Sequence, residues 1–134
     1  MTVENKRRNL SLEMLRCARN LADAQVLLGE QSHETAVSVA YYAALHAARA
    51  LLLTQGLEAR THAGLVHLLR IHFVQTERLA TEQVTALSQL FAQRQDADCD
   101  AATTFTAAMA ENALSRARAF VDDVRAILQS EGYL

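Results

Sequence analysis

Proline is absent from this 134-residue sequence, and glycine occurs only 4 times. Strand-rich folds need frequent turns, which these two residues usually supply, whereas long helices do not. This composition therefore disfavours an all-β sandwich or a multi-unit βαβ fold. Hydrophobic residues make up 51% of the chain and charged residues 21%, which is too apolar and too evenly charged for a disordered protein. The sequence predicts one compact, all-α domain.

Cysteine is also scarce, since only Cys17 and Cys99 are present and their separation matches no metal-binding or redox motif. We expect both to be buried or half-buried free thiols in a reducing cytosol. Lys6, Arg7 and Arg8 are not followed by the apolar run of a signal peptide. The longest run without charge or histidine in the most apolar helix, residues 35–45, is shorter than the roughly 20 residues of a membrane span. The prediction is a cytoplasmic protein without a membrane partner.

Charge of one sign is not in excess, because the net charge is -2 and the pI is near 6.2. This argues against a strongly basic nucleic-acid-binding protein and leaves room for a local basic patch.

Hydrophobic periodicity predicts five helices within a single domain that spans residues 1–134. Within this domain, residues 1–10 are expected to form a flexible or weakly ordered start. Short connections between the helices favour antiparallel neighbours, and hence an up-and-down antiparallel bundle of four to five helices. In the fifth helix the predicted apolar stripe is Phe105, Met109, Ala113, Phe120, Val124 and Leu128. The expected ranges are 11–29, 32–55, 61–76, 81–100 and 102–130.

A polar stripe interrupts the second and most apolar of these helices. Ser38, Tyr42, His46 and Arg49 follow one another at steps of four, four and three residues, which places them on one side of a helix. Polar groups on a buried helix must bond to one another, to a neighbouring helix or to a ligand. The stripe therefore either lines a cleft for phosphate or ribose groups, or forms a solvent-facing edge or an interhelix network.

Arg94 and Asp98 continue the apolar stripe that Val84, Leu87 and Phe91 define on the fourth helix. An arginine on the core side of a helix must find a partner or reach a cleft. One interpretation is an ion pair between Arg94 and Asp98 within the helix, with Asp96 and Asp100 on other faces. The other is a guanidinium fork that binds phosphate.

Metal-site and cofactor motifs are absent from the sequence. His62, His67 and His72 are five residues apart, which turns successive side chains by about 140° and keeps them off a common face. The chain has no HExxH pattern, no Cys/His pairing and no Gly-rich phosphate loop. We therefore expect neither a metal nor a cofactor.

Three motifs follow one another along the chain: AYYAALHAARALL at residues 40–52 with Gly56 after it, THAGL at residues 61–65, and RQDADC at residues 94–99. In this order they resemble the HEPN domains (higher eukaryotes and prokaryotes nucleotide-binding), in their small prokaryotic stand-alone branch. The resemblance covers about residues 32–100. It implies an antiparallel helical bundle that forms a homodimer and partners a small nucleotidyltransferase, often in a toxin–antitoxin pair.

Many HEPN proteins are metal-independent ribonucleases that use an arginine followed, after four to six residues, by a histidine. Arg94 fits the arginine position here, but Cys99 stands where the histidine is expected, and Asp100 and Ala101 occupy the other permitted positions. The thiol is a poor replacement for imidazole, because its unperturbed pKa is about 8.5 and its hydrogen bonds are weak. The usual pair of arginine and histidine is therefore incomplete. The tyrosine usual in this branch is also missing, so a nucleotidyltransferase that modifies a tyrosine there would lack its acceptor.

Three functions follow from this reading of the sequence. The first is a homodimeric HEPN module that binds nucleotide or RNA phosphate near Arg94, with Asp98, Tyr42, His46 and Arg49 as further binding residues, and partners a nucleotidyltransferase. The second is a metal-independent ribonuclease toxin in which Arg94 works with His46 or His62 from another helix. The third is a helical adaptor without a nucleotide site.

Overall fold

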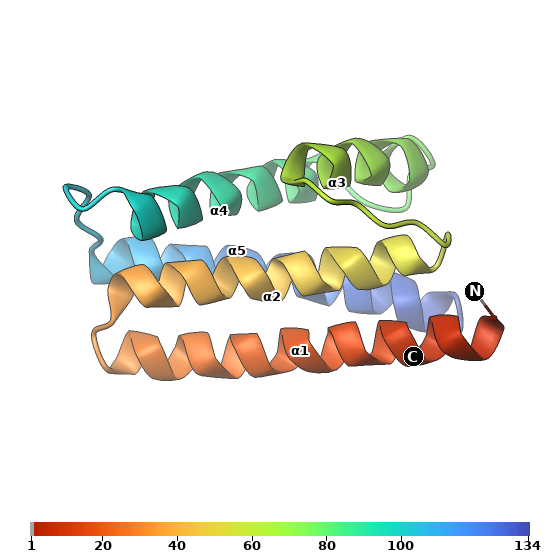
Figure 1. The fold of residues 1–134 in the computed structure, drawn as a ribbon, viewed down its shortest axis with the longest axis horizontal. Coiled ribbons are helices and arrows are strands. Elements are labelled where there is room, and N and C mark those ends of the chain that lie inside the picture. The colour runs from red at the N-terminus through yellow and green to blue at the C-terminus, as the bar shows by residue number, and fades with distance from the viewer. Residues whose placement is uncertain (1) are drawn as a thin grey trace.

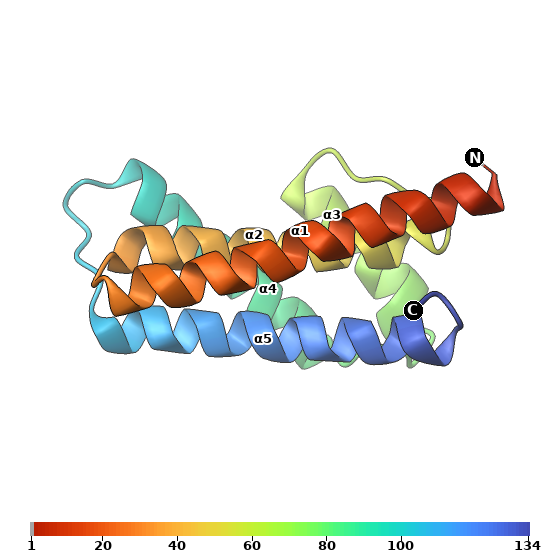
Figure 2. The ribbon, with the colours of Figure 1, turned by 90° about the horizontal axis from the view of Figure 1, so that it is seen from below.

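The computed structural model describes residues 2–134, which form helices joined by turns and contain no strand. The helices are α1 (Val3–Gly29), α2 (His33–Leu53), α3 (His62–Leu69) with a π-helical turn η1 (Arg70–Val74), α4 (Thr81–Cys99) and α5 (Ala107–Ser130). Long helices that follow one another in the chain run antiparallel, and both chain ends lie at the same end of the bundle (Figures 1 and 2). The predicted all-α antiparallel bundle is confirmed.

Helix α2 forms the centre of the bundle, because it packs against α1, α4 and α5. Thirteen of its 21 residues are buried, and seven of these are alanines. Small alanine side chains let the neighbouring helices approach α2 closely. Because α2 is covered on several sides, its sequence is apolar nearly all round. By length and composition alone α2 could cross a membrane, but 72% of its most apolar window is buried inside the bundle, as in a core helix.

The start of α1 differs from the prediction of a weakly ordered segment at residues 1–10. Met1 lies outside the described residues, but the helix already begins at Val3, where the Thr2 side chain accepts a hydrogen bond from the Asn5 amide. Arg7 donates to the carbonyl of Gly132 at 2.8 Å, and Leu10 is completely buried. Contacts with the C-terminal turn and the core therefore hold this segment in a helix.

Two other helices have ends that periodicity did not predict. Helix α3 passes into the π-helical turn η1. Arg78 contacts this turn, because its guanidinium carbon lies 4.3 Å from the centre of the Phe73 ring and its Nη2 donates to the carbonyl of His72. The fifth begins at Ala107 and not near residue 102, because the Thr106 side chain caps it. Two members of its expected stripe also differ, since Phe105 is buried just before the helix and Met109 is exposed.

The two cysteines have different environments. Cys17 is completely buried, and burial raises the pKa of its thiol to about 11. Cys99 is exposed at the end of α4, so the expectation of a buried or half-buried thiol was wrong there. Both are free thiols.

Candidate phosphate-binding site

Arg94 lies among aromatic rings between α2 and α4. Its Nη1 donates to the Tyr42 hydroxyl at 3.1 Å, and its Nε lies 3.7 Å from Oδ2 of Asp98. The guanidinium carbon is 5.5 to 5.7 Å from the ring centres of Tyr41, Tyr42 and Phe91, within the range of cation–π attraction. The helical ion pair with Asp98 is therefore present, but it is one of several contacts that aim Arg94 at α2.

Asp98 also connects the two helices. The Ser38 hydroxyl on α2 donates a hydrogen bond to Oδ1 of Asp98, which leaves Oδ2 for the long ion pair with Arg94. Ser38 and Tyr42, the first half of the predicted polar stripe, thus face α4 and hold the carboxylate and the guanidinium in place. A buried serine with a carboxylate acceptor meets the requirement that buried polar groups be hydrogen-bonded.

His46 lies on a different side of α2 from Tyr42. Its Nδ1 is 2.6 Å from Oε2 of Glu13 on α1, so it faces the other neighbour of the central helix. Each four-residue step overshoots a full helical turn by about 40°, which carries the stripe from α4 toward α1. His46 and Arg94 therefore lie in different contacts, although the sequence offered His46 as a partner for Arg94.

Three arginines surround a small hollow, which we call the arginine cavity. Its volume is about 160 Å³, and no aspartate or glutamate is among the residues that line it. Arg49 comes from α2, Arg94 from α4, and Arg60 from the segment between α2 and α3. The remaining lining residues are Tyr41, Tyr42, Leu45, Ala59, Thr61, His62, Leu65 and Phe91. Cationic forks beside aromatic rings are a combination that suits phosphate and nucleotide ligands.

His62 is the histidine that lines the arginine cavity. Its ring stacks on Phe91 at a centre-to-centre distance of 4.0 Å, and its Nδ1 lies 3.2 Å from the Tyr41 hydroxyl. Its Nε2 makes a longer contact of 3.4 Å with the Ser88 hydroxyl. Burial lowers the pKa of His62, so the imidazole is neutral at pH 7 and can accept a proton.

The backbone around His62 is shaped by the THAGL segment. The Thr61 side chain caps α3 by accepting a hydrogen bond from the Gly64 amide at 3.0 Å. A β-carbon at Gly64 would lie only 3.1 Å from that hydroxyl oxygen, so glycine leaves room for the cap. The cap fixes the first turn of α3, where His62 is the first helical residue.

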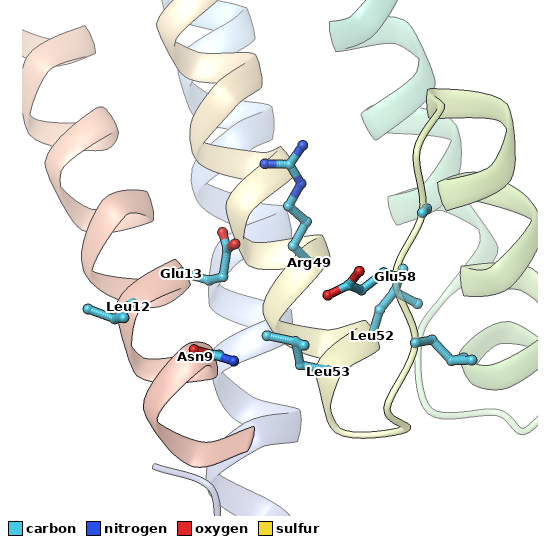
Figure 3. Close-up of a pocket in the computed structure, with 9 residues that line it drawn as sticks. Asn9, Leu12, Glu13, Arg49, Leu52, Leu53 and Glu58 are labelled. Carbon is cyan, nitrogen blue, oxygen red and sulfur yellow. The ribbon is translucent and has the colours of Figure 1, made fainter. Parts of the chain in front are cut away.

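A second and larger cavity, the α1–α2 groove, adjoins the first. Its volume is about 400 Å³, and Arg49 and Ala59 line both cavities. Figure 3 shows Asn9, Leu12 and Glu13 on α1, Arg49, Leu52 and Leu53 on α2, and the Glu58 carboxylate turned toward α2. Leu57 and Ala59 complete the lining. The groove thus combines leucine walls with two carboxylates.

The structure brings together some of the predicted site residues. Arg94, Tyr42, Arg49 and His62 line the arginine cavity, whereas His46 and Asp98 do not. Arg60 was not among the predicted site residues, because it lies in an irregular segment where helical periodicity does not indicate which way a side chain points. Cys99 does not line the cavity either. Among residues 2–134, no group of three or more histidine, cysteine, aspartate or glutamate residues is arranged to hold a metal ion.

Comparison with known families agrees with the motifs. The family model described as "HEPN domain" matches residues 13–127, which is most of the chain and includes every residue of the arginine cavity. The chain belongs to the HEPN family. This family assignment confirms the resemblance that residues 40–52, 61–65 and 94–99 indicated.

Relatives of this HEPN domain come from archaea and bacteria. Two proteins of Methanocaldococcus jannaschii, each named "Putative toxin", are 26% and 31% identical. The first alignment covers 96% of this chain and 87% of the relative, and the second covers 82% and 81%. A "UPF0332 protein" of Thermotoga maritima is 27% identical over 81% of this chain and 83% of its own length.

Proposed function

We propose that this HEPN domain binds the phosphate groups of RNA or of a nucleotide in the arginine cavity. The observation that supports the proposal is the convergence of Arg49, Arg60 and Arg94 from three parts of the chain on one hollow without a lining carboxylate. Guanidinium groups bind phosphate oxygens through paired hydrogen bonds. Tyr41, Tyr42 and Phe91 add aromatic surface on which a base or ribose packs.

The size of the cavity favours part of a strand over an enclosed small molecule. A volume of about 160 Å³ is smaller than the roughly 300–1,000 Å³ of pockets that enclose a small-molecule ligand, so the hollow takes only part of a nucleotide. The rest of the ligand must therefore extend beyond the hollow. A single-stranded RNA, which carries a phosphate at every step, meets this condition.

Titration of a labelled single-stranded RNA with the purified protein tests the proposal. If three arginines each neutralise one phosphate, the logarithm of the binding constant should fall with the logarithm of salt concentration with a slope of about -2. Absence of saturable binding in a folded sample would contradict the proposal and favour a helical adaptor without a nucleotide site.

A second candidate function, metal-independent RNA cleavage, is favoured by the position of His62 in the same cavity as Arg94. In this reaction the ribose 2′ oxygen attacks the neighbouring phosphorus as its proton passes to neutral His62, and the bond to the 5′ oxygen breaks. Arg94 would stabilise the negative charge that develops on the phosphate, and the protonated imidazole would return a proton to the leaving 5′ oxygen. His62 would thereby replace the histidine that the usual motif lacks at position 99.

Incubation of a labelled RNA without added metal tests this second function. Cleavage by the wild type, with a loss of about 100-fold or more in His62→Ala, is expected if His62 is the general base. The control is the RNA affinity of His62→Ala, which should stay close to that of the wild type. No cleavage by a folded sample that binds RNA would exclude the ribonuclease and leave the binding function.

We further propose that the domain acts as a homodimer and partners a nucleotidyltransferase in a toxin–antitoxin pair. Support comes from the family and from the names of the two Methanocaldococcus jannaschii relatives. Light scattering at micromolar concentration should give twice the chain mass of 14.8 kDa. A monomer mass across this concentration range would contradict the dimer.

A further inference from the structure

We propose that the α1–α2 groove is a guanine-binding subsite for a ligand whose phosphate lies in the arginine cavity. This inference rests on the proposed phosphate-binding function. Arg49 and Ala59 line both cavities, so a ligand that extends past these two residues can place one part in each cavity. Arg49 at the boundary can bind the phosphate that joins the two positions.

Charge assigns different parts of the ligand to the two cavities. Three arginines line the arginine cavity, whereas the groove has Arg49 together with the carboxylates of Glu13 and Glu58. Carboxylates repel phosphate, so the groove must take an uncharged part of the ligand. Its volume of about 400 Å³ lies within the usual range for small-molecule sites, and leucine side chains provide apolar contact for a base.

Glu58 selects among the bases by its hydrogen-bonding chemistry. An ionised carboxylate only accepts hydrogen bonds, and its two oxygens match two neighbouring N–H donors. The Watson–Crick edge of guanine presents such a pair at N1 and N2. Adenine and cytosine present one amino group beside an acceptor nitrogen, and uracil presents one N–H between two carbonyls. Guanine is therefore the base that a carboxylate in this groove should prefer.

Glu58 is better placed for this role than Glu13. Oε2 of Glu13 already contacts His46 at 2.6 Å. Within residues 2–134, by contrast, no hydrogen bond or ion pair of the Glu58 carboxylate is found, and Figure 3 shows it turned toward α2. The segment that carries Glu58 also carries Arg60, so one stretch of chain supplies a group to each cavity.

The test compares three labelled hexanucleotides that differ at one position in a run of uridines, which holds guanosine, inosine or adenosine. The wild type should bind the guanosine oligomer at least about fivefold more tightly than the adenosine oligomer. Inosine, which keeps N1–H but lacks the N2 amino group, should lie between them. Glu58→Ala should reduce the preference for guanosine to less than twofold. Glu111→Ala makes the same charge change at an exposed position on α5, and it should keep the preference.

The outcomes separate this inference from the function on which it rests. Equal affinity for all three oligomers, with binding that still depends on Arg94, overturns the guanine subsite and leaves phosphate binding intact. Absence of binding to every oligomer overturns both. A guanosine preference that Glu58→Ala leaves unchanged overturns the inference, and an altered mass of that variant in light scattering then assigns the groove to a protein contact. A guanosine preference that Glu58→Ala reduces supports the inference, and titration with guanosine monophosphate then shows whether the guanine belongs to RNA or to a free nucleotide.

Discussion

Replacement of Arg94 by alanine is expected to lower the affinity for single-stranded RNA by about 10- to 150-fold. This range corresponds to the loss of about 1.5–3 kcal/mol, the usual contribution of a charge-assisted hydrogen bond. Arg94 should reach the upper part of the range if it binds two phosphate oxygens, because its guanidinium is already oriented by the Tyr42 hydroxyl and by three aromatic rings. Fluorescence anisotropy of a labelled RNA measures the change.

The matched control for Arg94→Ala is Arg118→Ala on α5. Arg118 is exposed, contacts Gln25 and does not line the arginine cavity, so its loss makes the same change in net charge elsewhere on the molecule. Folding of Arg94→Ala should be preserved, because its pairs are partly exposed and Asp98 keeps its hydrogen bond with Ser38. An equal loss of affinity in both variants would indicate a general charge effect. Unchanged affinity in Arg94→Ala would remove the arginine cavity from the proposal.

Leu10→Ala is expected to lower the free energy of unfolding by about 2–5 kcal/mol, as truncation of a fully buried leucine usually does. Leu10 has no exposed surface in the structure, although it lies in the segment for which the sequence predicted weak order. Urea denaturation followed by circular dichroism measures the difference. The expected loss is a large part of the total stability of a domain of this size.

Leu12→Ala provides the control for Leu10→Ala, because it deletes the same atoms two residues away. Leu12 is 54% exposed, so its truncation should change the free energy of unfolding by no more than about 0.5 kcal/mol. Similar small effects in the two variants would mean that the first turns of α1 do not pack on the core as described. A large effect in Leu10→Ala alone establishes that they do.

The local sequence did not predict where α1 and α5 begin. The start of α5 is recognisable after the fact as the Thr106 cap, but alanines at positions 101 and 102 are equally compatible with a helix. The first turns of α1 depend on long-range contacts, such as that of Arg7 with the carbonyl of Gly132. A pattern within one helix contains no information about a partner 125 residues away.

The sequence predicted only part of the candidate site, because the site also depends on contacts between distant parts of the chain. Arg94 stood out because it continues an apolar stripe, and Tyr42 and Arg49 because they interrupt a buried helix. Arg60 belongs to no periodic segment, so its place in the arginine cavity follows only from the path of the chain between α2 and α3. His46 and His62 were equal candidates as the partner of Arg94, yet His46 faces α1 and His62 lines the arginine cavity.

By itself, the sequence determined the fold class and the family. The absence of proline, the helical spacing of apolar residues and three ordered motifs are local properties, and local properties are sufficient for these conclusions. Only the tertiary structure decided which polar groups meet, because packing of α4 and the segment before α3 against α2 sets their distances. That packing places three arginines and a neutral histidine around one hollow and a carboxylate in the groove beside it.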